Sequence, residues 1–144
     1  MHRAVGPLLT GTYVIVGNLN GQASNPRISR EDTSSTLVST ASKNDEPTKW
    51  HFERVGHDVI RLHNKETGKA YRPSAFYDGV ALDQECDSLD FIIKETEIKG
   101  DYVVSIAEDP AYYAIPVEHG RPFKLFKERN LKAVPHWSFF HVDD

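Results

Sequence analysis

One segment near the N-terminus has residue types that could engage another protein, because it places two arginines on an exposed backbone stiffened by proline. It reads Asn25-Pro26-Arg27-Ile28-Ser29-Arg30-Glu31-Asp32. Trypsin-like serine proteases recognise an arginine that enters a deep pocket with an acidic floor. A loop already held in the bound conformation avoids much of the ordering cost of about 0.5 to 1.5 kcal/mol per immobilised side chain. Such a loop would bind the protease tightly and inhibit it. From the segment alone, a flexible loop with two solvated arginines is the stronger interpretation.

Other residue types with chemical potential lack the spacing that chemistry needs. The seven histidines form no H-x-x-x-H pair beside a third ligand, and His57 and His63 stand at opposite ends of one expected strand. Serine, histidine and aspartate are plentiful, but no G-x-S-x-G turn exposes a nucleophile. We therefore expect surface histidines, no metal, no cofactor and no enzymatic activity.

The single cysteine, Cys86, lies among Asp83, Glu85 and Asp87. One cysteine excludes an internal disulfide. Neighbouring carboxylates disfavour a thiolate and raise the pKa of the thiol, so a passive cysteine is expected. The acidic cluster lacks the spacing and the glycine of a calcium loop, and it is interpreted as a solvated turn.

Composition indicates one globular domain. The 144 residues carry a net charge of −4, with 26% charged and 39% hydrophobic residues. Nucleic-acid binders show a basic stripe that is missing here. Uncharged apolar stretches reach about five residues, whereas a membrane span needs about 20. The N-terminal residues 1–9 are too short and broken for a signal peptide core, so we expect a cytoplasmic protein or one secreted without a leader.

Short runs of alternating apolar and polar residues, each closed by a turn signal, predict an all-β protein. No helical pattern of ten or more residues is present. The clearer strands are expected at Thr12–Val16, Lys49–Val55, Val59–His63, Leu89–Glu95, Tyr102–Ile106, Phe123–Lys127 and His136–Val142. Weaker ones are expected at Gly21–Asn25, Leu37–Thr40, Lys69–Arg72, Val80–Asp83 and Tyr112–Val117, and Asp109-Pro110 is interpreted as a turn.

A weak internal repeat arranges these strands into three units. Tyr13, Val59 and Tyr102 open similar strands at spacings of 46 and 43 residues. Large aromatic residues close the units at Trp50, Phe91 and Trp137, at spacings of 41 and 46. Twelve strands in three units of four predict a β-trefoil with repeats at 11–56, 57–99 and 100–144, rather than a sandwich or an eight-stranded barrel.

Carbohydrate binding is the alternative function for such a fold. A sugar-binding trefoil of the ricin type would show Gln-x-Trp near the ends of its repeats, and neither Gln22 nor Gln84 precedes a tryptophan. The exposed aromatic rings that sugar binding would need are sought in Tyr112-Tyr113 and Phe76-Tyr77. Paired aromatics usually place one ring inside and one outside, because neighbouring strand residues face opposite sides.

Four motifs follow one another along the chain: Gly11-Thr12-Tyr13-Val14-Ile15, Pro47-Thr48-Lys49-Trp50, Ile60-Arg61-Leu62 and Phe139-Phe140-His141-Val142-Asp143. In their order and spacing, and over nearly the whole length from Gly11 to Asp143, the chain resembles the fungal fruiting-body β-trefoil serine protease inhibitors of the cospin type. In those relatives the inhibitory residue sits on the loop after the second strand, which corresponds here to Asn25–Thr33.

The resemblance implies a single-domain, monomeric inhibitor of a trypsin-like serine protease. Arg30 is the first choice for the residue that enters the protease pocket, Arg27 the second and Asn25 the third. Two departures stand against this: Thr33–Ser42 is rich in serine and threonine, and Glu31-Asp32 follows Arg30 directly. Another loop, Asp83–Ser88 or Glu118–Pro122, remains an alternative for inhibiting a different protease class.

Overall fold

The computed structural model describes residues 2–19, 22–28, 37–40, 49–117, 123–130 and 133–142. Regular structure in this part of the chain is β-sheet, with no α-helix. In chain order the strands are β1 (His2–Arg3), β2 (Gly11–Leu19), β3 (Gln22–Ile28), β4 (Leu37–Thr40), β5 (Lys49–Gly56), β6 (Val59–Asn64), β7 (Ala70–Arg72), β8 (Val80–Ala81), β9 (Gln84–Cys86), β10 (Leu89–Glu95), β11 (Tyr102–Ile106), β12 (Asp109–Ala114), β13 (Lys124–Lys127) and β14 (Trp137–Val142). Within the described ranges, nothing helical has the length and apolarity to cross a membrane.

Six strands form a closed barrel. Each pairs with its two neighbours in the order β14, β2, β5, β6, β10 and β11, and β11 returns to β14 through the pair Tyr102 and Trp137. Every one of these pairings is antiparallel. Closure removes the exposed sheet edges that would otherwise template aggregation.

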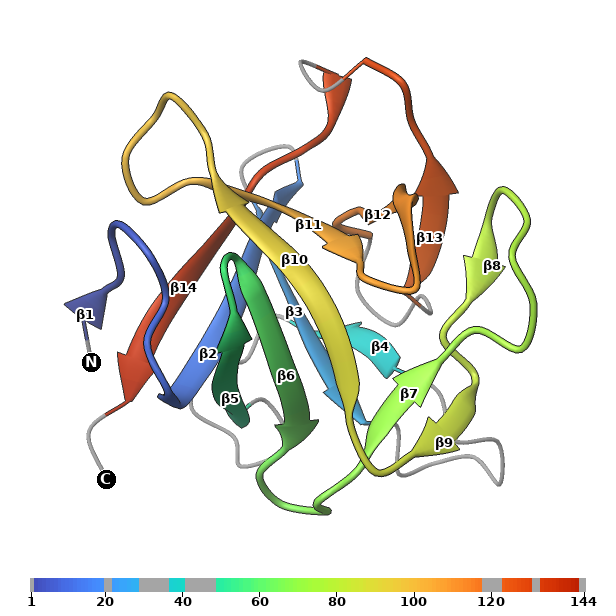
Figure 1. The fold of residues 1–144 in the computed structure, drawn as a ribbon, viewed down its shortest axis with the longest axis horizontal. Helices are drawn as coiled ribbons and strands as arrows, with labels where there is room; N and C mark the ends of the chain where they lie inside the picture. The colour runs from blue at the N-terminus through green and yellow to red at the C-terminus, as the bar shows by residue number, and fades with distance from the viewer. Residues whose placement is uncertain are drawn as a thin grey trace.

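Three hairpins accompany the barrel, one from each successive third of the chain: β3 with β4, β7 with β9, and β12 with β13. In Figure 1 the strands β4, β7, β9 and β13 lie toward the right of the view, and both chain ends lie at the left. Six barrel strands and three hairpins in a threefold order make this fold a β-trefoil, which confirms the predicted fold class.

The aromatic residues that close the units occupy equivalent positions in the barrel. Trp50, Phe91 and Trp137 are all buried. In the strand pairing, Trp50 stands opposite Tyr13, and Trp137 stands opposite Tyr102. All three rings therefore face the common core, as the repeat predicted.

One position of the predicted repeat was shifted by a residue. Phe91 stands opposite Ile60, which is buried, whereas Val59 is only half-buried. Ile60, and not Val59, is therefore the equivalent of Tyr13 and Tyr102. The shift has a local cause, because the pairing of β5 with β6 is irregular between Arg54 and Gly56 and thus holds an extra residue.

The strand assignments differ from prediction in the second unit. Val80–Ala81 forms β8, which pairs with β13 of the third unit, and the hairpin partner of β7 is β9. The acidic cluster around Cys86, expected to be a solvated turn, therefore includes the strand β9. Leu82, the residue after β8, extends the contact with the third unit, because its backbone N–H donates to the Phe123 carbonyl oxygen at 3.2 Å.

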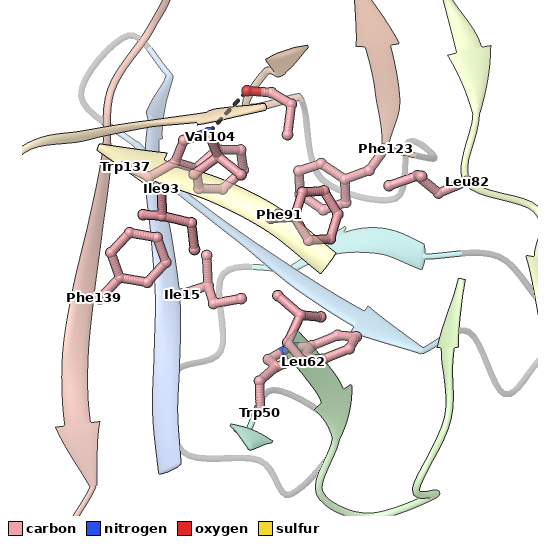
Figure 2. A pocket seen from close by; sticks show the side chains of 11 residues that line it. Ile15, Trp50, Leu62, Leu82, Phe91, Ile93, Val104, Phe123, Trp137 and Phe139 are labelled. Atoms are coloured by element: carbon pink, nitrogen blue, oxygen red, sulfur yellow. Dashed lines mark hydrogen bonds between the residues drawn. The ribbon is translucent and has the colours of Figure 1, made fainter. Parts of the chain in front are cut away.

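The barrel interior is apolar and holds a cavity of about 60 Å³. Figure 2 shows aromatic and aliphatic side chains converging on it from β2, β5, β6, β10, β11 and β14. Phe52 and Phe139 continue this packing, with their ring centroids 5.6 Å apart in an edge-to-face arrangement. A cavity without polar lining stays dry, so it belongs to the core and offers no groups for catalysis.

The N-terminal residues close over one end of the barrel. Arg3 donates to Asp101 and to the Gly100 carbonyl oxygen, the latter at 3.2 Å. The Gly6 N–H donates to the Glu95 carboxylate at 2.9 Å, and the Tyr102 hydroxyl donates to the Gly6 carbonyl oxygen at 2.5 Å. These bonds connect the start of the chain to the loop between β10 and β11.

Gly17 is required where Trp137 packs against β2. The two residues stand opposite each other, and a Cβ atom on Gly17 would lie 2.8 Å from the Trp137 ring and 2.7 Å from Pro116. We predict that Gly17→Ala lowers the free energy of unfolding by about 1–3 kcal/mol, because neither ring can move without disturbing the core. Urea unfolding measures this. Gly56→Ala is the control, since its Cβ would meet Val59 at an ordinary 3.6 Å; equal losses in both variants would contradict the close approach.

The phenol of Tyr102 is predicted to titrate well above the ordinary pKa of a tyrosine. Burial, with a smaller effect of the Glu95 charge, raises its pKa from 10.0 to about 12. The native state therefore keeps a proton that the unfolded chain loses, so stability is undiminished below pH 10 and is lost as the pH rises toward about 12. Absorbance at 295 nm during a pH titration measures this. Tyr102→Phe should remove a titration step near pH 12, whereas a spectrum that is already complete near pH 10 would contradict the burial.

Candidate functional site

The predicted protease-contacting segment divides between a strand and undescribed residues. Asn25, Pro26, Arg27 and Ile28 form the second half of β3 and pair with β4, with Arg27 opposite Val38. The strand was expected to end at Asn25. It continues through Pro26 because β3 is paired only with β4 there, and a strand edge tolerates a residue without an N–H.

The other half of that segment, Ser29, Arg30, Glu31 and Asp32, lies outside the described residues. It belongs to the connection between β3 and β4, residues 29–36, in which Arg30 is the single basic residue. Arg27 has its backbone in the β3–β4 ladder, in keeping with its second place behind Arg30. The choice of Arg30 first and Arg27 second as the pocket residue stays a prediction that the structure does not test.

The acidic stretch around Cys86 is tied into the second hairpin. The Lys69 ammonium forms an ion pair with the Asp87 carboxylate at 2.8 Å, and the Cys86 thiol donates to the Ser88 carbonyl oxygen at 3.4 Å. The pKa of the thiol is raised, as predicted, but burial is the main cause and the neighbouring carboxylates contribute least. Arg72 acts in the opposite direction.

The aromatic pairs considered for sugar binding each place one ring inward. Tyr112 is buried and contacts Phe76, with ring centroids 5.4 Å apart, while Tyr113 is half-buried. Tyr77 is 57% exposed and is the large aromatic ring that solvent reaches most easily in the described chain. Alternation therefore holds at both pairs, and Tyr77 is the one aromatic platform they provide.

A polar groove lies on the outside of the barrel between the second and third units. Its volume is about 520 Å³, within the range of about 300–1,000 Å³ that ligand pockets occupy. It is shallow and open. The lining residues come from β6, β7, the start of β10 and the turn between β11 and β12: Arg61, Arg72, Ser88, Leu89, Asp90, Ala107 and Glu108.

Strand register brings the first charged pair of the groove together. Arg61 and Asp90 stand directly opposite each other on β6 and β10, and both point outward because their neighbours Ile60 and Phe91 point into the core. Arg61 donates two hydrogen bonds to the Asp90 carboxylate, of 2.9 and 3.2 Å. This hydrogen bonding, together with the charge of Asp90, raises the pKa of the Arg61 guanidinium.

The second charged pair joins the hairpin of one unit to a turn of the next. Arg72, the last residue of β7, donates to both carboxylate oxygens of Glu108 at 2.9 and 2.8 Å. Glu108 lies in the turn before β12, and Ala107 in that turn donates its N–H to the Asp90 carbonyl oxygen at 3.0 Å. The sequence interpretation missed this turn because it assigned Asp109-Pro110 to it, whereas those two residues begin β12.

Paired arginines and carboxylates in an open groove favour a neutral polar ligand. A guanidinium offers five N–H donors, and a carboxylate accepts through about four lone pairs, so each pair retains hydrogen-bonding capacity beyond its own contacts. Leu89 and Ala107 add apolar surface. The groove therefore suits a ligand with both hydroxyl groups and C–H surface. Among the described residues, no three histidine, cysteine or acidic side chains gather as metal ligands.

Comparisons by sequence and by structure give different results. No protein-family model and no curated protein matches the chain by sequence. Its fold matches the Rhizoctonia solani agglutinin with a TM-score of 0.75 at 14% identity, covering 96% of this chain and 100% of that one. It matches the ricin B-like lectin of Macrolepiota procera, solved with lactose, with a TM-score of 0.76 at 16% identity, covering 95% and 99% of the two chains.

A third match is the Polyporus squamosus lectin, solved with Neu5Aca2-6Galb1-4GlcNAc, with a TM-score of 0.71 and 17% identity. The match covers 93% of this chain and 50% of the lectin. Likeness at this level of identity establishes the β-trefoil fold, which these fungal lectins share with the present chain. The resemblance to cospin-type inhibitors within that fold is a prediction that these matches do not test.

The groove can be probed without unfolding the protein. The Arg61 and Asp90 side chains are 46% and 34% exposed, and exposed ion pairs contribute little to stability. We predict that Asp90→Ala lowers the melting temperature by less than about 4 °C. Phe91→Ala, at the adjacent inward position, should lower it by more than about 10 °C. Differential scanning calorimetry measures both, and a large loss for Asp90→Ala would mean that the pair is structural.

Proposed function

We propose that this protein binds carbohydrate and acts by binding rather than by catalysis. The observation that carries the proposal is the polar groove, where two arginine–carboxylate pairs meet on the outer surface of a β-trefoil. The likeness to fungal lectins supports it, although a fold alone does not determine function. The same matches give no support to protease inhibition and favour the alternative that the sequence analysis kept open.

Sugars present neighbouring hydroxyl groups that donate and accept at once. Asp90 and Glu108 can accept from such hydroxyls, and the guanidinium groups of Arg61 and Arg72 can donate to them. These four side chains are held by one another, so little side-chain entropy is lost when a sugar binds. The groove is thereby preorganised for a polyhydroxylated ligand.

The same geometry sets the expected strength of binding. The groove is open to solvent, and its lining contains no aromatic ring. Charged side chains at about half exposure are well hydrated, so their exchange of water for sugar hydroxyls yields little net free energy. We expect a Kd on the order of 1 mM for a monosaccharide, about −4 kcal/mol, and tighter binding for an oligosaccharide that also covers Leu89 and Ala107.

A glycan array followed by calorimetric titration of the best glycan tests the proposal. Asp90→Ala and Glu108→Ala should each weaken binding at least tenfold, because each removes an acceptor and releases its arginine partner. Asp87→Ala is the matched control, since Asp87 is an exposed acid in the Lys69 ion pair and does not line the groove. Its affinity should equal that of the wild type.

Four results would contradict the proposal. The first is the absence of binding to any glycan, and the second is binding that survives both groove variants. The third is loss of binding in Tyr77→Ala alone, which would place the site at that exposed ring. The fourth is tight inhibition of trypsin that disappears in Arg30→Ala, since this would favour the inhibitor prediction.

A further inference from the structure

Two histidines face each other on the outer surface of the barrel. His51 on β5 and His63 on β6 are direct partners in the antiparallel pairing. Their neighbours Phe52 and Leu62 are buried in the core, so alternation directs both imidazoles outward. The ring centroids lie 5.1 Å apart with the planes tilted by 36°, and both residues are half-buried.

This separation is compatible with two imidazoles that share a single metal ion. A zinc–nitrogen bond of about 2.0–2.1 Å places the ion about 3.2 Å from the ring centroid, so two rings at a tetrahedral angle have centroids about 5 Å apart. We propose that His51 and His63 form a two-imidazole site for a divalent transition metal such as Zn²⁺, Ni²⁺ or Cu²⁺. Imidazole is a ligand that suits all three ions.

The charges around the pair are mixed in sign. On the same outward face, Glu53 lies beyond His51 on β5, and the cations of that face are Lys49, Arg61 and Lys65. Arg61 is paired with Asp90, and that carboxylate offsets its charge. The Lys65 ammonium donates to the Thr12 hydroxyl at 3.3 Å, and Thr12 stands opposite His51 on β2. This cation therefore lies beside the histidine pair and opposes a bound ion, which lowers the expected affinity.

The site is expected to be open. No third histidine, cysteine or acidic side chain among the described residues stands close enough to complete a set of three ligands. Water molecules would fill the remaining coordination positions. The ion would then be exchangeable, and its binding would be weaker than in a closed site with four protein ligands.

Proton competition follows from the same arrangement. Burial, with a smaller effect of the nearby His51, lowers the pKa of His63, while Glu53 opposes this shift. His63 is therefore neutral near pH 7 and available as a ligand. Binding should weaken as the solution is acidified, because protons compete with the metal ion for the ring nitrogens and only a neutral imidazole is a ligand.

Isothermal titration calorimetry of the full chain with ZnCl₂ and NiCl₂ at pH 7.5 tests the proposal. We expect one ion per chain and an affinity that falls at least tenfold in His51→Gln and in His63→Gln. His57→Gln is the control, because the His57 ring is 93% exposed and stands apart from the pair. It should bind like the wild type, and lowering the pH to 5.5 should abolish binding in both.

Several results would overturn the site. They are the absence of saturable binding, binding that survives both variants, and a loss that follows His141→Gln, which would point to the stacked His2–His141 pair instead. If a variant fails to fold, an NMR titration of the wild-type protein tests the same site. Imidazole proton resonances followed during Zn²⁺ addition should show two of the seven histidines responding first, and a uniform response of all seven would reject the pair.

Discussion

The structure depends on the closing contact of the barrel, where β11 meets β14. Tyr102 and Trp137 stand opposite each other at this point, and both are buried. The indole N–H of Trp137 donates to the Ala114 carbonyl oxygen at 2.9 Å. The Trp137 ring covers Gly17 on β2, the other strand that pairs with β14. The Tyr102 hydroxyl holds the N-terminal segment through Gly6. One pair of aromatic residues thus joins the barrel strands β2, β11 and β14. The same pair also contacts the end of β12 in the third hairpin and the start of the chain.

Much of this architecture could be read from the sequence because the three units repeat the same side-chain types. The aromatics Trp50, Phe91 and Trp137 recur at positions that the pairing shows to be equivalent. The prediction failed where backbone geometry, rather than residue type, decides the register. The irregularity between Arg54 and Gly56 shifts the equivalent residue from Val59 to Ile60, and a hydrophobic pattern does not reveal it, since both residues are β-branched and apolar.

The candidate site was harder to predict because it is made by contacts between distant residues. Arg61 and Asp90 meet only because β6 pairs with β10 in one register, and Arg72 and Glu108 meet only because a hairpin of one unit reaches a turn of the next. Neither pair forms a sequence motif. His51 and His63 were expected at unrelated surface positions for the same reason, since eleven residues of chain separate two rings that the β5–β6 pairing brings together. Once β5 and β6 are recognised as a hairpin, alternation alone places both histidines on the outer face.

Carbohydrate binding in the groove is the central claim, and mapping the bound sugar tests it most directly. Backbone amide shifts of the ¹⁵N-labelled protein would be followed while the best glycan of an array is added. The account predicts the largest changes at Arg61, Asp90, Ala107 and Glu108, with the amides around Tyr77 and in the connection 29–36 unaffected. Changes centred on either of those two regions, with the groove amides unmoved, would contradict it.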